Sequence, residues 1–159
     1  MVWIKIIPYI SLFTTSLLSS ASIIFLPIPI SLIATIEASI KNLNPLFSII
    51  SLSIGAAIGE FTSYFLGIGA TKVLEKKHLG EKRIMQIYNL FERYGFLAIF
   101  VFAALPLPFD IVGILAGTGK YDVKKFFIAT FLGKLVKFAF IFYITKLGIR
   151  IGHELQSLI

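Results

Sequence analysis

Two Pro-x-Pro breaks occur in the sequence, Leu26-Pro27-Ile28-Pro29 and Leu105-Pro106-Leu107-Pro108. Each break interrupts a long apolar stretch, which is followed by a polar connection and then by a second apolar stretch. Pro106 follows Pro27 by 79 residues. The same offset relates two aromatic pairs, Phe47 with Phe126 and Tyr64 with Tyr143. Apolar segments that proline or glycine interrupts at corresponding places in two halves are typical of membrane transporters that contain a duplicated unit. The sequence therefore predicts an internal repeat.

The composition places this repeat in a membrane. Of the 159 residues, 57% are hydrophobic and only 14% are charged, against about 25% charged in ordinary soluble domains. Four apolar segments, 6–36, 42–71, 94–119 and 126–145, are each long enough to cross a bilayer, which takes about 20 helical residues. The sequence lacks the alternation of a membrane β-barrel. We expect a multi-pass helical protein of the cell membrane, and we expect segment 6–36 to be mature protein, because its apolar run continues past the small residues at 20–22.

The basic residues predict the topology. Six of them lie in 72–93 and three more in 120–125, so both connections should be cytoplasmic. Both ends of segment 94–119 are then on one side, as in a re-entrant hairpin that turns at Pro106 and Pro108. Each leg of about 11 residues would rise about 16 Å, half of the hydrocarbon core. By the repeat, segment 6–36 would form a matching hairpin from the opposite face. The alternative for both segments is a spanning helix with a proline kink.

The predicted fold is an all-α integral membrane protein, an inverted repeat of a Pro-x-Pro re-entrant hairpin plus a transmembrane helix. The single membrane domain comprises repeat 1 at about 9–71, a cytoplasmic connection at about 72–93 and repeat 2 at about 94–150. We expect the connection to be a basic amphipathic helix on the membrane surface, divided near Gly80, that attracts anionic headgroups. Nucleic acid is not expected, because no nucleic-acid module accompanies the positive charge.

Small residues recur every four positions along segment 42–71. Gly55, Gly59 and Gly67 belong to this stripe, with Ser51 and Ser63. Such a stripe lets another helix backbone approach closely. It predicts a helix-packing face.

Four charged residues lie deep in the apolar segments: Glu60, Asp110, Lys134 and Lys137. Tyr64 lies one helical turn after Glu60. An intramembrane charge costs a few kcal/mol, so such residues usually face the interior of a bundle. One interpretation is mutual neutralisation. The other is a polar groove for a charged headgroup, an ion or a proton, with Tyr64 beside it. A lysine can also extend its long stem to the interface, and Lys134 is better placed to do so than Lys137.

Other chemistry is not expected. The chain has no cysteine, and its two histidines, His78 and His153, are solitary, so we expect no metal site and no cofactor. No serine stands in a nucleophile motif with a histidine base, and we expect the protein not to be an enzyme.

The order and spacing of several motifs resemble the DedA family, also called the VTT or SNARE-associated Golgi protein family. The resemblance covers roughly residues 20–143 and is closest to short bacterial and archaeal members. It rests on the following positions: both Pro-x-Pro breaks, Asn44-Pro45, Gly55, Gly59-Glu60-x-x-x-Tyr64-x-x-Gly67, Phe91-x-x-Tyr94-Gly95, Asp110, Ala116-Gly117, Phe126 and Gly133-Lys134. It implies two facing re-entrant hairpins in an inverted repeat. It also implies transport of phospholipids or polyprenyl phosphates between leaflets, in some members driven by the proton-motive force.

The resemblance also assigns roles to residues. The family's acid after the first Pro-x-Pro falls on Ser31, which is not acidic, whereas Glu60 and the acid after the second break, Asp110, match. The arginine pair of larger members is replaced by Lys134 and Lys137 on the next helix, which would contact a phosphate as point charges rather than as bidentate forks.

We therefore expect a lipid translocase or scramblase-like transporter for a lipid with a phosphate headgroup. Its expected partners are membrane lipids with anionic headgroups, with protons as a further candidate, and a homo-oligomer stays open. The alternatives are a proton- or cation-coupled transporter of a small solute, which would use the same charges, and a membrane scaffold or assembly factor that transports nothing.

Overall fold

The computed structural model describes residues 2–21, 30–76, 81–105 and 108–156, and these form seven helices without a strand. The helices are α1 (Val2–Ala21), α2 (Ile30–Ile40), α3 (Pro45–Gly59), α4 (Phe61–Lys76), α5 (Glu81–Ala104), α6 (Asp110–Thr118) and α7 (Val123–Gln156). Three stretches are long and apolar enough to cross a membrane: Pro45–Val73, Met85–Ala104 and Val123–Gly152. The predicted all-α, multi-pass membrane class is confirmed.

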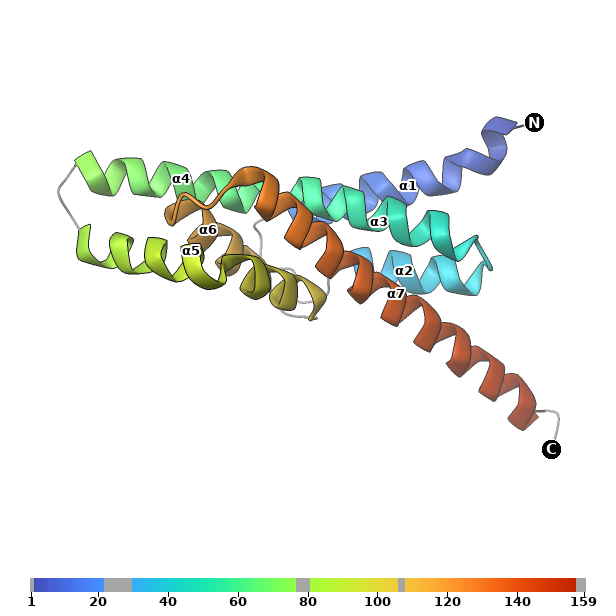
Figure 1. The fold of residues 1–159 in the computed structure, drawn as a ribbon. Helices are drawn as coiled ribbons and strands as arrows, with labels where there is room; N and C mark the ends of the chain where they lie inside the picture. Colours follow the sequence, from blue (N-terminus) through green and yellow to red (C-terminus); the bar gives the residue numbers. More distant parts are fainter. Residues whose placement is uncertain (1, 22–29, 77–80, 106–107, 157–159) are drawn as a thin grey trace.

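Helices α3 and α4 form one long rod (Figure 1). The rod begins at a cap, where the Asn44 side-chain oxygen accepts a hydrogen bond from the Leu46 N–H at 3.0 Å and Pro45 occupies the first turn. Glu60 lies between the two helices, but its N–H donates to the Ala56 carbonyl at 3.0 Å and its own carbonyl accepts from the Tyr64 N–H at 3.2 Å. Helical hydrogen bonding therefore continues through the junction, and the rod keeps its direction.

Helix α1 packs on the first half of the rod through glycines. A Cβ atom at Gly55 would collide with the Phe13 carbonyl, and one at Gly59 would collide with the Leu17 carbonyl. Because both residue numbers rise together, α1 and α3 run parallel. The absence of side chains at these glycines lets the two backbones touch.

Helix α6 packs on the second half of the rod in the same way. Gly113 lies against the Ser63 side chain, and Gly117 against the Tyr64 carbonyl, with no room for a Cβ atom at either. These numbers also rise together, so α6 runs parallel to α4. The stripe predicted from the sequence thus serves two partners, α1 at Gly55 and α6 beyond Ser63.

Helix α7 is the second long helix, and it too has a partner on each half. Near its first half, Gly133 lies against the Phe100 carbonyl and the Ala103 side chain of α5. Near its second half, the Ser39 hydroxyl of α2 donates to the Phe142 carbonyl at 3.0 Å. The rod is thus covered by α1 and α6, and α7 is covered by α2 and α5.

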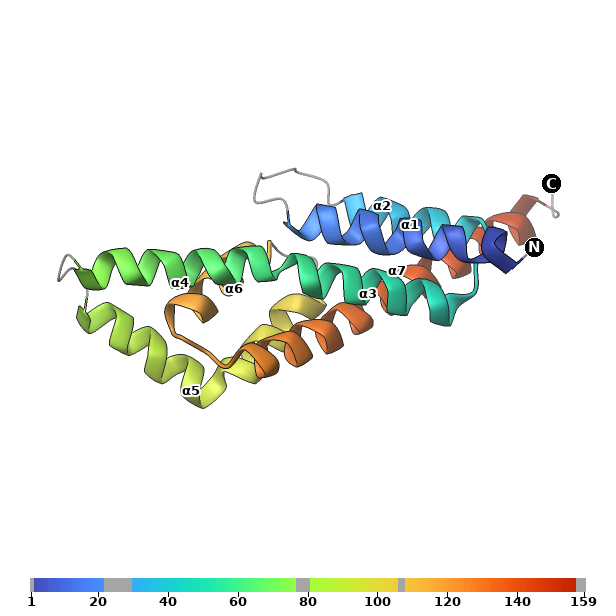
Figure 2. The same cartoon turned by 90° about the horizontal axis from the view of Figure 1, so that it is seen from above.

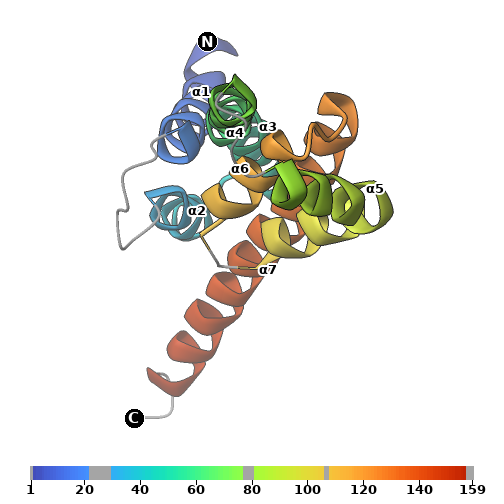
Figure 3. The ribbon, with the colours of Figure 1, turned by 90° about the vertical axis from the view of Figure 1, so that its left-hand side faces the viewer.

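The α1/α2 pair and the α5/α6 pair approach from opposite ends of the molecule. The turn between α2 and α3 lies at one end of the rod, and the end of α4 and the start of α5 lie at the other (Figures 1 and 2). Seen along the rod, α1 and α2 lie on one side and α5 on the other (Figure 3). Two separate apolar clusters fill the two halves, one around Phe91, Ile99 and Phe126, the other around Leu52 and Phe138.

The same turn follows α2 and α6. Two positions after each of these helices ends, a residue has φ of 51°: Asn42 after α2 and Lys120 after α6. Two positions later, a side-chain oxygen caps the next helix, from Asn44 at α3 and from Asp122 at α7. The two turns are therefore related by 78 residues, within one of the sequence offset.

The segment 72–93, predicted as a surface connection, is shared between two longer helices. Its two ends belong to α4, which ends at Lys76, and to α5, which continues without interruption from Glu81 to Ala104. The expected first leg, 94–105, is thus mostly the second half of a 24-residue helix. The reason is that 81–104 contains no proline, and its single glycine, Gly95, packs against the Tyr121 ring instead of ending the helix. The predicted break at Gly80 lies outside the described residues.

Candidate functional site

A buried ion pair lies at the middle of the rod. Glu60 follows Pro45 by 15 residues and precedes Lys76 by 16, so it is about 22 to 24 Å from either end. Its Oε1 accepts a hydrogen bond from Lys134 Nζ of α7 at 2.6 Å, and the two side chains are only 4% and 5% exposed. This burial is incompatible with the alternative in which Lys134 extends to the membrane surface.

The start of α6 completes this site. Lys134 Nζ lies 5.1 Å from the centroid of the Phe109 ring, which is buried immediately before α6. Asp110, the first residue of α6, is half-buried and lies near enough to Lys134 to interact electrostatically. Lys134 of α7 therefore meets groups from two other elements, the rod and the start of α6.

Two polar atoms near the pair lack partners among the described residues. They are Oε2 of Glu60 and the hydroxyl of Thr130, which lies one turn before Lys134 on α7. Buried polar atoms nearly always have hydrogen bonds, so an exception calls for an explanation such as an ordered water, an ion or a ligand. The site thus has unused hydrogen-bonding capacity, one acceptor on the rod and one hydroxyl on α7.

Lys137 is a second buried lysine on the same helix. It is 7% exposed, and no carboxylate of the described residues pairs with it. The ring contact that it makes is with its own neighbour, Phe138, at 5.8 Å. A buried ammonium group without a counter-ion is unfavourable. Such a lysine is either neutral or pairs with an anion that the described residues do not supply.

The α1/α2 and α5/α6 pairs both reach the rod close to Glu60. Ser20 and Ala21, at the end of α1, lie against Gly59, and Gly113 of α6 lies against Ser63. Of the predicted hairpin tips, Pro108 is exposed and precedes α6 by two residues. Pro27, Pro29 and Pro106 lie outside the described residues.

Tyr64, which the sequence grouped with the four charges, takes part in a different set of contacts. Its hydroxyl donates a hydrogen bond to the Tyr121 carbonyl in the turn before α7. Its ring packs on Phe126, with 4.8 Å between centroids. The contacts of Tyr64 thus fasten the second apolar half together.

Sequence reasoning missed Phe109 and Thr130. Phe109 lies between the second break and Asp110, and Thr130 precedes Lys134 by four residues, but nothing in either residue type pointed to the site. No group of three or more His, Cys, Asp or Glu side chains that could hold a metal ion occurs within the described ranges.

Comparisons with known proteins give one family. The family model of the VTT domain matches residues 15–147. The chain is 34% identical over 105 residues to the Vacuole membrane protein 1 homolog of Dictyostelium discoideum, covering 52% of this chain and 26% of that protein. It is 29% identical over 126 residues to the Alkaline phosphatase-like protein of Lactococcus lactis, covering 71% and 59%.

An uncharacterized protein of Methanocaldococcus jannaschii is 26% identical over 85 residues, which cover 54% of this chain and 53% of that protein. The chain thus spans between about a quarter and three fifths of the length of these relatives. No solved structure matches it.

Proposed function

Because the chain belongs to the VTT-domain family of membrane proteins, we propose that it moves a lipid with a phosphate headgroup between the leaflets of its membrane. The observation that carries this proposal is the buried Glu60–Lys134 pair midway along the rod. Three residues further along α7 is Lys137, a buried lysine with which no carboxylate of the described residues pairs. Charged side chains at this depth are costly, so they usually either pair with one another or serve transport. Lys137 lacks a neutralising partner among the described residues.

The proposed path lies between two re-entrant hairpins of an inverted repeat, α1/α2 and α5/α6. The opposite directions of the two pairs, their common approach to the rod near Glu60 and the repeated turn at Asn42 and Lys120 support this topology. Backbone that is interrupted at membrane depth must be buried in protein or line a wet cavity. The two hairpin tips would then border a polar groove.

In this mechanism the headgroup crosses through the groove while the acyl chains stay in the lipid. Lys134 and Lys137 attract the phosphate as point charges. Glu60 pairs with Lys134, Asp110 lies near the same lysine, and Asp110 is the candidate proton carrier. A phosphate at Lys137 would supply the missing counter-ion.

Purified protein in liposomes with a fluorescent phospholipid tests the proposal. An impermeant quencher should reach inner-leaflet lipid in protein-containing vesicles and only outer-leaflet lipid in empty ones. Lipid movement that requires a proton gradient would mean coupled transport, and movement without one would mean scrambling. Solute uptake without lipid movement would favour the small-solute transporter, and the absence of both would favour a scaffold.

Single cysteines test the topology, since the chain contains none. Lys82→Cys near the start of α5 and Lys124→Cys near the start of α7, both exposed, should react with an impermeant thiol reagent from one side only. Lys41→Cys, in the turn between α2 and α3, should react only from the opposite side. Labelling of Lys82→Cys and Lys124→Cys from opposite faces would exclude the hairpin and the inverted repeat with it.

A further inference from the structure

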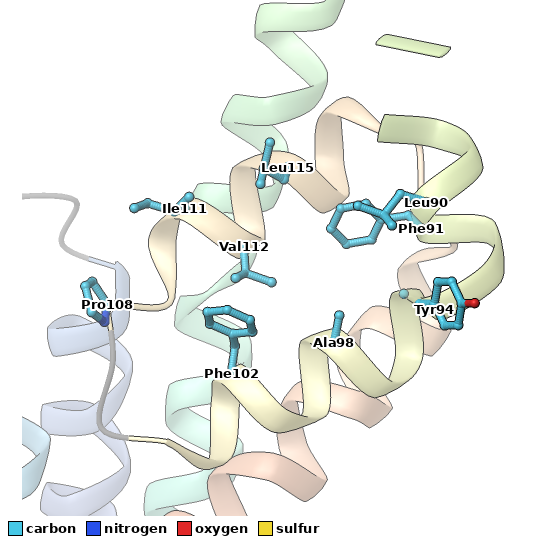
Figure 4. Close-up of a pocket in the computed structure, with 10 residues that line it drawn as sticks. Leu90, Phe91, Tyr94, Ala98, Phe102, Pro108, Ile111, Val112 and Leu115 are labelled. Atoms are coloured by element: carbon cyan, nitrogen blue, oxygen red, sulfur yellow. The ribbon is translucent and has the colours of Figure 1, made fainter. Parts of the chain in front are cut away.

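A pocket of about 410 Å³ lies between α5 and α6, and the mechanism above does not use it (Figure 4). Leu90, Ala98 and Phe102 line it from α5, and Val112 and Leu115 line it from α6. Its lining is apolar except for the Tyr94 hydroxyl at its edge. Its volume lies within the range of small-molecule sites, about 300 to 1,000 Å³.

The pocket opens on the outside of the bundle. Six of its ten lining residues are exposed, among them Leu90, Phe102 and Ile111. In a membrane protein this surface faces the hydrocarbon, so the apolar groups that meet the opening are acyl chains. A chain that enters gains little hydrophobic free energy, because the bilayer is equally apolar. Specific occupancy therefore needs a second interaction.

A basic group at one end of the pocket supplies that interaction. The exposed Arg93 guanidinium lies 5.2 Å from the centroid of the Tyr94 ring. An anionic phosphate complements this charge.

The direction of the pocket matches that of a lipid. From Leu90 to Phe102 it follows α5 for about 18 Å, from the basic end toward the middle of the rod. A phospholipid in that leaflet has its phosphate at the interface and its chain directed toward the midplane, which is the same order. We propose that the pocket binds one acyl chain of an anionic phospholipid whose phosphate lies at Arg93. This inference depends on the membrane location of the chain and not on translocation, so each can fail without the other.

Photocrosslinking tests the site in the full chain. Protein in vesicles receives phosphatidylglycerol with a photoreactive group in one acyl chain, or phosphatidylcholine with the same chain. The label should concentrate in peptides from 90–115. Ala98→Trp should fill the pocket and reduce this labelling to background. Leu97→Trp, the same change at the neighbouring exposed position outside the pocket, should leave it unchanged.

The headgroup contact is tested separately at an exposed residue whose replacement should not disturb folding. Arg93→Gln should lower phosphatidylglycerol labelling about fivefold, equivalent to about 1 kcal/mol, and leave phosphatidylcholine labelling unchanged. Circular dichroism and gel filtration check that each variant is folded.

Three results would overturn the inference. The first is labelling spread evenly over α5, α6 and the exposed face of α7, and the second is equal labelling of Ala98→Trp and Leu97→Trp. The third is a dimer that Ala98→Trp dissociates without any lipid label, because the pocket would then be covered by a second copy. Equal responses of the two lipids to Arg93→Gln would remove the phosphate contact.

Discussion

Removing one charge of the Glu60–Lys134 pair should destabilise the protein more than removing both. The 2.6 Å separation corresponds to an attraction of about 6 kcal/mol at an effective dielectric constant of about 20. Desolvation of two groups that are each about 5% exposed offsets most of it. Glu60→Gln or Lys134→Met leaves the other charge buried and unpaired, which costs about 3 to 5 kcal/mol. The double variant leaves no charge, so it should lose less than either single variant.

The free energy of unfolding, measured for all four proteins in mixed micelles as denaturing detergent increases, gives the coupling energy of this cycle. We expect at least about 2 kcal/mol of coupling. Additive losses below about 1 kcal/mol for each variant would refute the buried pairing. Translocation separates the two roles of the pair, because a double variant that is stable but inactive indicates that transport uses the charges. A double variant that regains activity would make the pair purely structural.

The remaining predictions concern single positions. Lys137→Ala should abolish lipid translocation and keep the protein folded. The control Lys146→Ala, at an exposed position of the same helix, should transport at the wild-type rate. Normal transport by Lys137→Ala would assign Lys137 a structural role. Gly117→Ala should cost about 1 to 3 kcal/mol of stability, because its Cβ atom would collide with a backbone carbonyl of α4. Gly148→Ala, which meets open space, should be neutral or stabilising by up to about 1 kcal/mol on the same unfolding assay. Asp110→Asn should remove the pH dependence of translocation if Asp110 must be protonated. The wild-type rate then falls as the carboxyl ionises with rising pH, whereas asparagine stays neutral at every pH. An unchanged pH profile would exclude proton coupling through Asp110.

Sequence reasoning reached the membrane class and the family because both depend on composition, spacing and proline, which act locally. It did not reach the extent of α5, because whether Gly95 ends a helix depends on what packs against it, here the distant Tyr121 ring. It also left open which lysine pairs with Glu60. Lys134 and Lys137 lie on one helical face, and only the packing of α7 against the rod, 74 residues away, selects Lys134.

The α1/α2 and α5/α6 pairs differ in the charge that they bring to the rod. Ser31 stands 79 residues before Asp110, and it is buried in α2, where its N–H donates to the Ser19 hydroxyl at 3.4 Å and its carbonyl accepts from Thr35 at 2.7 Å. These contacts are local and neutral. Among the described residues, α1 and α2 contribute no buried charge, whereas α6 brings Asp110 to Lys134. In the proposed mechanism, a phosphate or proton at the centre would therefore meet charge from the rod, α7 and the α5/α6 pair. Proton coupling would then use Asp110 without an acidic counterpart in the described part of α2.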